Sequence, residues 1–149
     1  VYWHVRRMVF NHEDSNDIVQ DVFVKIWKNL DSFREEAQLF TWIYRIATNE
    51  ALSFIKKKKR KHLLSLSGYE NYVADKLLDD NFFTGDEIQM RLQKALLKLP
   101  DKQRLVFNMK YFDAMKYDEI SEVLGTSVGA LKASYHIAVK KIEKSVKDD

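Results

Sequence analysis

Apolar residues recur every three or four positions along most of the chain, which is the spacing of an α-helix with one buried face. Strand-like alternation is rare, and the 149 residues include only 4 glycines and 1 proline. The helical patterns cover residues 1–11, 15–30, 41–61, 86–98, 101–112, 117–124 and 128–145. The sequence therefore predicts an all-α protein.

The helical patterns fall into two blocks that predict two small domains. The segment between them is acidic and holds no sustained period. We therefore expect domains over residues 1–66 and 86–149, joined by an acidic linker over 67–85 with a transient helix at about 73–79. The chain begins at Val1, without an initiator Met and already in helical rhythm, so we expect the first domain to be truncated at its N-terminus.

The pattern over residues 15–30 has the widest apolar stripe. Ser15 or Asp14 is suited to cap its N-terminus, and Asp17 lies in the first turn, where the helix dipole favours an acid. The positions predicted to share its apolar face are Ile18, Val19, Val22, Phe23, Ile26, Trp27 and Leu30. Those predicted to be buried in the pattern over 41–61 are Ile43, Ile46, Ala47, Ala51 and Phe54.

Composition narrows the class of protein. There are no cysteines, which excludes disulfides, thiolate metal sites and Cys nucleophiles and is compatible with a reducing cytoplasm. No apolar run approaches the ~20 residues that cross a bilayer, so we expect a cytoplasmic protein without direct membrane insertion. Residues 1–66 carry 12 Lys and Arg against 8 Asp and Glu, and residues 88–149 carry the same numbers. Both mildly basic blocks are therefore candidates to face a polyanion.

The sequence lacks the residue patterns that are typical of enzyme active sites. The four histidines are scattered, at positions His4, His12, His62 and His136. There is no HExxH, no phosphate-binding glycine loop and no obvious convergent pair of carboxylates. We therefore expect no catalytic residues, no cofactor and no metal, and leave a nucleic-acid enzyme as a remote alternative.

The stretch LGTSVGALKASYHIAVKK, residues 124–141, has the features of a helix-turn-helix. Gly125 is suited to a left-handed turn after one helix, and Ser127 to capping the next. The positions predicted to lie inward are Ile120, Leu124, Val128, Leu131 and Tyr135. The second helix of such a pair enters the major groove of DNA, with Lys132, Ala133 and His136 exposed. A helical hairpin that binds nothing is the alternative.

A second candidate nucleic-acid surface lies on the pattern over residues 41–61. Trp42, Arg45, Asn49 and Lys56 follow helical spacing outside the apolar stripe, and Phe40 and Tyr44 lie near them. Aromatic rings interleaved with cations suit unstacked bases and their backbone. The basic run KKKKRK that follows is equally consistent with a solvated surface. The preceding helix is predicted to expose Asp17, Gln20, Asp21 and Lys28, an acidic face that suits a partner protein rather than DNA, or is simply solvated.

These blocks together resemble one family. DSNDIVQDVFVKIW, FTWIYRIATNEA, a basic run, a linker and LPDKQRLVFNMKYFDAMKYDEISEVLGTSVGALK are similar in order and spacing to extracytoplasmic-function (ECF) sigma factors of the sigma-70 superfamily. The resemblance implies a region 2-like bundle of three or more helices and a region 4-like four-helix domain. It also implies a non-enzymatic initiation factor that directs core RNA polymerase to −10 and −35 promoter elements and helps to open the −10 region.

The resemblance and the exposed faces together give the candidate sites. Those for core polymerase are Asp17, Gln20, Asp21, Phe23 and Trp27. Those for the −10 element, in and after the matching segment 34–49, are Phe40, Trp42, Arg45, Asn49, Lys56 and Lys57. Those for the −35 element are Ser127, Ala130, Lys132, Ala133, His136 and Lys140. Ala133, Ser134 and Ile137 stand where relatives often carry Ser, Arg and Arg, which predicts weak phosphate anchoring by the second domain alone.

The family resemblance also predicts the partners. They are bacterial RNA polymerase core, promoter DNA and an anti-sigma factor, which in this family is often membrane-anchored. An autonomous helix-turn-helix regulator remains the alternative, but it leaves residues 1–66 without a role.

Overall fold

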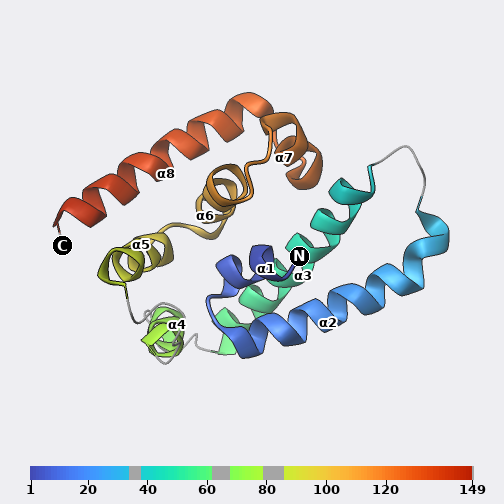
Figure 1. The fold of residues 1–149 in the computed structure, drawn as a ribbon, viewed down its shortest axis with the longest axis horizontal. Helices are drawn as coiled ribbons and strands as arrows, with labels where there is room; N and C mark the ends of the chain where they lie inside the picture. The colour runs from blue at the N-terminus through green and yellow to red at the C-terminus, as the bar shows by residue number, and fades with distance from the viewer. Residues whose placement is uncertain (34–37, 62–67, 79–85, 149) are drawn as a thin grey trace. The chain divides into compact units, whose positions relative to one another are not determined.

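The computed structural model describes residues 1–33, 38–61, 68–78 and 86–148, and within these ranges every regular element is helical (Figure 1). The α-helices are α1 (Tyr2–Val9), α2 (His12–Asn29), α3 (Leu39–Lys61), α4 (Gly68–Leu78), α5 (Glu87–Leu97), α6 (Asp101–Phe107), α7 (Tyr117–Leu124) and α8 (Val128–Asp148). A 3-10 turn over Leu30–Ser32 follows α2. The predicted all-α class is confirmed.

The chain separates into two compact units, Val1–Val73 and Ala74–Asp149, and the division falls inside α4. Of the linker expected over 67–85, residues 67 and 79–85 lie outside the described ranges, and the remainder forms α4. Tyr69, Val73 and Leu77 recur at helical spacing in α4 and are all buried, at 8%, 1% and 1% exposed. This buried stripe explains why a segment with acidic composition forms a helix.

In the first unit, α1 and α2 meet at a sharp corner. Phe10 ends α1 in a left-handed conformation with a φ of 71°. Asn11 then caps α2, and its side-chain oxygen accepts a hydrogen bond from the Asp14 amide at 2.9 Å. The prediction of Ser15 or Asp14 as the cap is therefore wrong. The helix begins one turn earlier because Asn11 has the extended backbone that a cap needs. The apolar pattern could not reveal this first turn, since it contains no apolar residue.

The core of the first unit uses only part of the apolar stripe of α2. Ile18 and Val22 are buried against α1 and α3, whereas Phe23, Trp27 and Leu30 are 55%, 80% and 48% exposed. Neighbouring helices cover only one side of the apolar stripe of α2, so its other side stays exposed. In α3 the small residues Ala47 and Ala51 are fully buried, as predicted. Ile43, Ile46 and Phe54 are only half-buried.

In the second unit, α8 packs on α5, α6 and α7. The most buried large side chains of this unit are Leu77, Leu96, Leu105, Met109, Ile120 and Leu131. The single helix predicted over 101–112 is instead α6 followed by a π-helical turn over Asn108–Phe112. The extra residue of a π-helical turn shifts the helical register. At this turn the rings of Phe107 and Tyr111 stack with centroids 5.2 Å apart.

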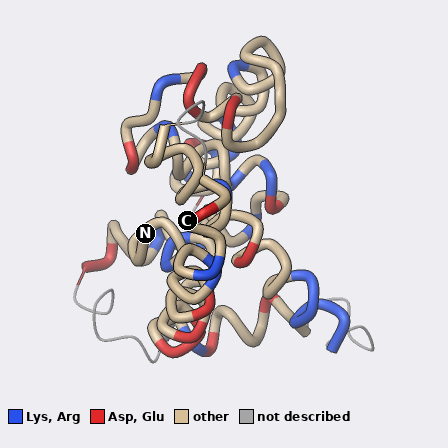
Figure 2. The backbone as a smooth tube through the Cα atoms, turned by 90° about the vertical axis from the view of Figure 1, so that its right-hand side faces the viewer, with Lys and Arg blue, Asp and Glu red and all other residues tan. Residues whose placement is uncertain are grey.

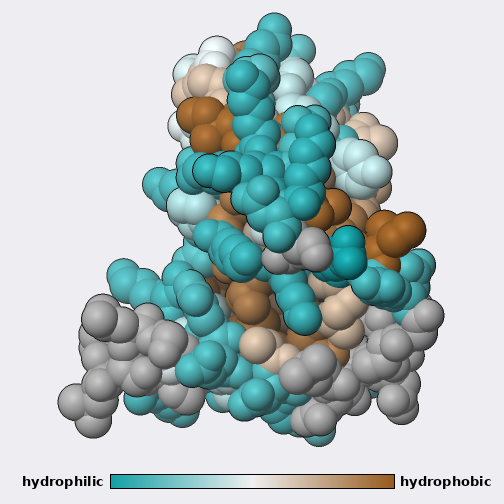
Figure 3. Space-filling model, turned by 90° about the vertical axis from the view of Figure 1, so that its left-hand side faces the viewer, coloured by the Kyte–Doolittle hydropathy of each residue, from teal (hydrophilic) through white to brown (hydrophobic). Residues whose placement is uncertain are grey.

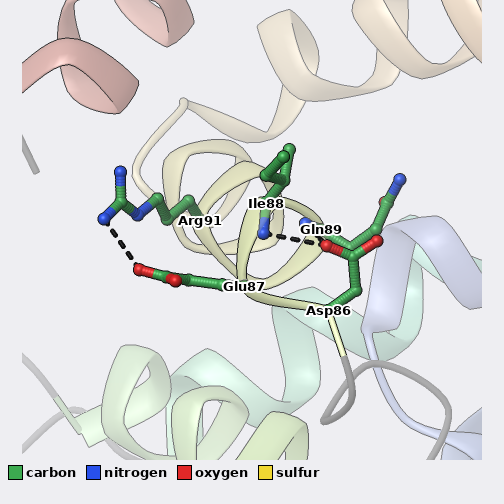
Figure 4. Close-up of polar contacts among 5 residues, drawn as sticks. All are labelled: Asp86, Glu87, Ile88, Gln89 and Arg91. Carbon is green, nitrogen blue, oxygen red and sulfur yellow. Dashed lines mark hydrogen bonds and ion pairs between the residues drawn. The ribbon is translucent and has the colours of Figure 1, made fainter.

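The first helix of the second unit has a well-formed N-terminus (Figure 4). The Asp86 carboxylate accepts hydrogen bonds from the amides of Ile88 and Gln89 at 2.9 and 3.3 Å. Glu87 and Arg91, one turn apart, form an ion pair at 2.8 Å. Because free N–H groups at a helix start need acceptors, these contacts explain why α5 begins where it does.

On the face drawn in Figure 3, hydrophilic residues (teal) cover more of the surface than hydrophobic ones (brown). In the part of the chain that the structure describes, no helix is long and apolar enough to cross a membrane. Among the same residues, no group of three or more His, Asp or Glu side chains is placed to hold a metal ion.

Candidate protein and nucleic-acid interfaces

The outward face of α2 combines carboxylates with large exposed apolar side chains. Asp17, Gln20 and Asp21 are exposed on the first half of the helix, and Phe23 and Trp27 follow on the second. An apolar group that is 80% exposed, as Trp27 is, forfeits the free energy of burial unless another molecule covers it. Large exposed apolar side chains of this kind are typical of protein-binding surfaces, whereas carboxylates repel the phosphates of DNA.

The α3 surface carries the aromatic and basic side chains predicted from the sequence. Arg45, Asn49, Lys56 and Lys57 are exposed. Phe40 is 42% exposed. The structure thus gathers this candidate set on one helix, with polar groups outward. Residues 34–37, the start of the segment 34–49, lie outside the described ranges.

Trp42 and Phe40 each lean on a second ring. The Trp42 indole is half-buried and lies 5.0 Å, centroid to centroid, from Phe33. Phe40 lies 4.5 Å from Tyr44, whose ring lies 4.7 Å from that of His4. Rings fixed in this way present their edges and faces with little loss of conformational entropy on binding.

The row of rings ends in a buried polar contact that the sequence gave no reason to expect. His4, in α1, is 1% exposed, and its Nε2 lies 2.8 Å from the Thr48 hydroxyl of α3. The contact anchors α1 beneath the aromatic side of α3. Only the i, i+4 spacing of Phe40, Tyr44 and Thr48 hints at the row, and nothing in the sequence places His4 beside it.

The basic end of α3 contacts tyrosines of α4. Figure 2 shows the lysine and arginine run as a continuous blue stretch of backbone. The Lys58 ammonium lies 5.0 Å from the Tyr72 ring centroid, and the Lys59 ammonium lies 5.5 Å from that of Tyr69. The Tyr72 hydroxyl donates a hydrogen bond to the Asp14 carboxylate at 2.9 Å. Sequence reasoning missed this contact because α4 falls in the predicted linker.

The environment of Tyr72 alters its ionisation. Burial, the hydrogen bond to Asp14 and the charges of Asp14 and Glu13 raise the pKa of Tyr72 to about 12. Each of these disfavours the phenolate, since burial penalises charge and the carboxylates repel it. Tyr72 therefore stays a hydrogen-bond donor throughout the physiological range.

The second unit contains the predicted helix-turn-helix in α7 and α8. Gly125 ends α7 with a φ of 68°, and its amide donates to the Ser121 carbonyl at 2.8 Å. The Ser121 hydroxyl donates to the Thr126 carbonyl at 2.7 Å and closes the turn. The Ser127 hydroxyl accepts from the Ala130 amide at 3.2 Å, which confirms the predicted cap of α8.

The outward face of α8 carries the second candidate set. Its exposed members are Ser127, Ala130, Lys132, Ala133, His136 and Lys140. Of the positions predicted to lie inward, Ile120 and Leu131 are fully buried, and the other three are half-buried. Tyr135, one of these three, stacks on Phe107 at 5.8 Å, and burial raises the pKa of Tyr135.

Tyr117 and Lys110, which the sequence analysis did not single out, lie next to this face. The ammonium of Lys132 lies 5.7 Å from the ring centroid of Tyr117, and the ammonium of Lys110 lies 4.5 Å from it. The Tyr117 ring at the start of α7 therefore gathers a cation from the π-helical turn beside a cation from α8. Helical periodicity could not predict this cluster, because Lys110, Tyr117 and Lys132 belong to three different helical segments.

Comparison with known proteins decides the family. The Sigma-70 region 2 family model matches residues 1–61, and the Sigma-70, region 4 model matches residues 89–142. The ECF RNA polymerase sigma factor SigW of Bacillus subtilis (strain 168) is 35% identical to this chain, over 99% of the chain and 83% of SigW. The chain belongs to the ECF RNA polymerase sigma factors. The resemblance inferred from the sequence is confirmed.

Other sigma factors match as well. The ECF RNA polymerase sigma-E factor of Escherichia coli (strain K12) is 26% identical, over 89% of this chain and 74% of that protein. The fold is shared with the sigma factor RpoE from Bartonella quintana, solved with the anti-sigma factor NepR (TM-score 0.74, 21% identity, covering 99% of this chain and 90% of RpoE). It is also shared with CnrH, solved with the cytosolic domain of CnrY (TM-score 0.72, 24% identity, 99% and 80% covered). This sigma factor is thus a DNA-binding transcription initiation factor, of a family that is not enzymatic.

Proposed function

We propose that this sigma factor docks on core RNA polymerase through the outward face of α2. The observation that carries the proposal is Trp27, which is 80% exposed next to Phe23 at 55%. Exposed aromatic side chains of this size are typical anchors at protein interfaces. Asp17, Gln20 and Asp21 form the polar part of the same face and favour a basic partner surface.

The aromatic and basic surface of α3 is proposed to read and open the −10 element. Phe40 and Trp42 offer rings for bases displaced from the stack, and stacking on them offsets the cost of melting. Arg45 and Asn49 are exposed beside them and can hydrogen-bond to bases. Lys56 and Lys57, further along the helix, are proposed to contact backbone phosphates.

The face of α8 is proposed to enter the major groove at the −35 element. Ser127 and Ala130 lie at the N-terminus of the helix, where free amides favour phosphate. Ala133 and His136 point to base edges in this proposal, and Lys132 and Lys140 meet the backbone. The small side chains at two of these positions allow close approach but supply few charge contacts, which makes the second unit a weak reader without polymerase.

An anti-sigma factor is proposed as a further partner. RpoE and CnrH, which share this fold, were solved with the anti-sigma factor NepR and with CnrY. The apolar side chains of α2 offer such a partner the same contact surface as polymerase. Binding of either would then exclude the other.

The proposal is tested with core polymerase and a library of randomised duplex templates. Adding the chain should produce transcripts whose templates share two elements, near −10 and −35. Trp27→Ala should weaken core binding by at least about thirty-fold, the effect of an interface hot spot. Trp3→Ala is the matched control, since Trp3 is also exposed, at 47%, but lies on α1.

Two outcomes would contradict the proposal. Transcription unchanged by adding the chain would remove the role on promoters that we assign to these surfaces. Tight specific binding to duplex DNA without polymerase would favour the alternative, an autonomous helix-turn-helix regulator.

A further inference from the structure

The basic end of α3 is partly covered by the chain itself. Among its six consecutive cations, Lys58 lies over the rings of Tyr72 and Phe54, at 5.0 and 5.5 Å. Lys59 lies over Tyr69 at 5.5 Å. Exposed lysines are normally free to meet a phosphate, but these two face aromatic rings of a helix that follows them in sequence.

The covering segment is held in a defined position. Tyr69 and Val73 are 8% and 1% exposed, so their side of α4 is buried. Tyr72 is fixed at its other end by the hydrogen bond from its hydroxyl to Asp14, at 2.9 Å. Asn11 donates to the same carboxylate at 2.7 Å, which keeps Asp14 pointed at the tyrosine. The cover is therefore a specific contact between α4, α2 and α3.

An open site lies beside the covered cations. A hollow of about 470 Å³ at the end of α3 is lined by Phe54, Lys57, Lys58, Arg60 and Lys61. Four cations around one hollow can each meet a phosphate of a nucleic-acid backbone, because such a backbone presents several phosphates in a row. Lys58 belongs both to this hollow and to the contact with Tyr72.

We propose that α4 is a displaceable cover of a phosphodiester-binding site formed by Phe54, Lys57, Lys58, Arg60 and Lys61. The site extends the proposed role of α3 in DNA binding, on which this inference rests, to three cations outside the sets predicted from the sequence. A backbone phosphate on Lys58 competes with the Tyr72 ring for the ammonium, and it is repelled by Asp14, which lies at the tyrosine hydroxyl. Binding of DNA and docking of α4 therefore oppose each other.

The competition favours DNA once several phosphates bind together. A charge-assisted hydrogen bond to phosphate is stronger than a cation–π contact near the surface. The contacts that hold α4 are few, whereas a duplex offers a phosphate to each cation. By linkage, loss of the cover must raise the affinity for the backbone by the same factor as DNA weakens the docking of α4.

The test measures binding of the full chain to a fluorescein-labelled 12-base-pair duplex of mixed sequence at low salt. Tyr72→Ala should tighten binding by roughly three- to ten-fold, the range of one or two surface contacts released. Tyr72→Phe should give a smaller gain, because it removes only the hydrogen bond to Asp14. In a background of Lys58→Ala and Lys59→Ala, Tyr72→Ala should give no gain, since the covered cations are absent.

Hydrogen exchange provides the second measurement. Amides of α4 should exchange faster when the duplex is bound, because the helix is released. Unchanged or weaker binding by Tyr72→Ala, no binding by any variant, or slower exchange in α4 would overturn the inference. Weaker binding would mean that the tyrosine is part of the DNA surface.

The two proposals fail separately. A chain that supports transcription with core polymerase, but whose Tyr72→Ala variant binds the duplex no better, leaves the proposed function standing and removes the cover. A chain that fails to support transcription, but whose Tyr72→Ala variant gains affinity for the duplex only when Lys58 and Lys59 are present, removes the proposed function and leaves the cover standing.

Discussion

The Nε2 atom of His4 and the hydroxyl of Thr48 lie 2.8 Å apart in the core of the first unit, although 44 positions separate them in the sequence. Both side chains are 1% exposed. The contact joins α1 to α3 directly below the aromatic row of Phe40 and Tyr44. A polar pair buried at this place favours this packing of the two helices, because separating the pair would leave a buried polar atom without its partner.

Replacement of Thr48 by Val should destabilise the first unit by about 1–3 kcal/mol, since it keeps the shape of the side chain but removes the partner of His4 Nε2. Urea unfolding followed by tryptophan fluorescence measures this unit alone, because Trp3, Trp27 and Trp42 all lie within it. Ser53→Ala, at an exposed position of the same helix, is the control and should change little. Equal stability of the two variants would show that the buried contact contributes nothing.

The two glycines of the helix-turn-helix should respond in opposite directions to alanine. A Cβ atom at either Gly125 or Gly129 would meet nothing within 4 Å, so the two sites differ only in backbone conformation. Gly125 has a φ of 68°, and Gly125→Ala should cost about 1–2 kcal/mol. Gly129 lies inside α8, and Gly129→Ala should stabilise the unit by about 0.5–1 kcal/mol.

Amide exchange in α7 and α8 measures both changes. Protection should fall for Gly125→Ala and rise for Gly129→Ala. A fall of similar size in both variants would contradict the assignment of the turn to Gly125 alone.

Lys132 should contribute one phosphate-type contact to promoter binding. For the chain assembled with core polymerase, Lys132→Ala should weaken binding to duplex promoter DNA and reduce the salt slope by about 1. Lys144→Ala is the matched control, because Lys144 is exposed near the end of the same helix but outside the predicted face. Identical salt slopes for the two variants would place Lys132 away from the DNA.

Docking of α4 should weaken in strong base. The pKa of Tyr72 is raised to about 12, above its ordinary value of 10.0, so the docked state favours the protonated phenol. The stabilisation is therefore fully present below pH 10 and is lost as the pH rises from about 10 to 12. Exchange of α4 amides, corrected for the intrinsic pH dependence, measures the loss.

The control for this pH dependence is Tyr72→Phe, which cannot ionise and should abolish it. The same loss of protection in Tyr72→Phe as in the parent protein would assign the effect to general alkaline unfolding.

The helix-turn-helix could be located from the sequence because its signals are local. Gly125 and Ser127 act through their own backbone and the next turn of helix, and both behave as predicted. Helical period likewise identified α5, α7 and α8 closely. The exposed positions of the candidate set on α8 follow from the same period, since each residue turns by about 100°.

Contacts between distant segments could not be predicted in this way. Helical periodicity placed Phe23 and Trp27 on the apolar face of α2, but only the packing of α1 and α3 decided that they stay exposed. The cap at Asn11 depends on the left-handed turn at Phe10, which no apolar pattern marks. The π-helical turn after α6 also breaks the period on which the prediction rested.

The sequence by itself determined most of the helices, the turn at Gly125 and the family, because periodicity, capping and motif order are properties of neighbouring residues. Only the tertiary structure decided which apolar faces remain open and which cations are covered. Tyr72 and Asp14 lie 58 positions apart, and Tyr72 meets Lys58 only because the first part of α4 folds back within the first unit. Such contacts depend on how whole helices bury their apolar sides together, and this is a property of the folded chain.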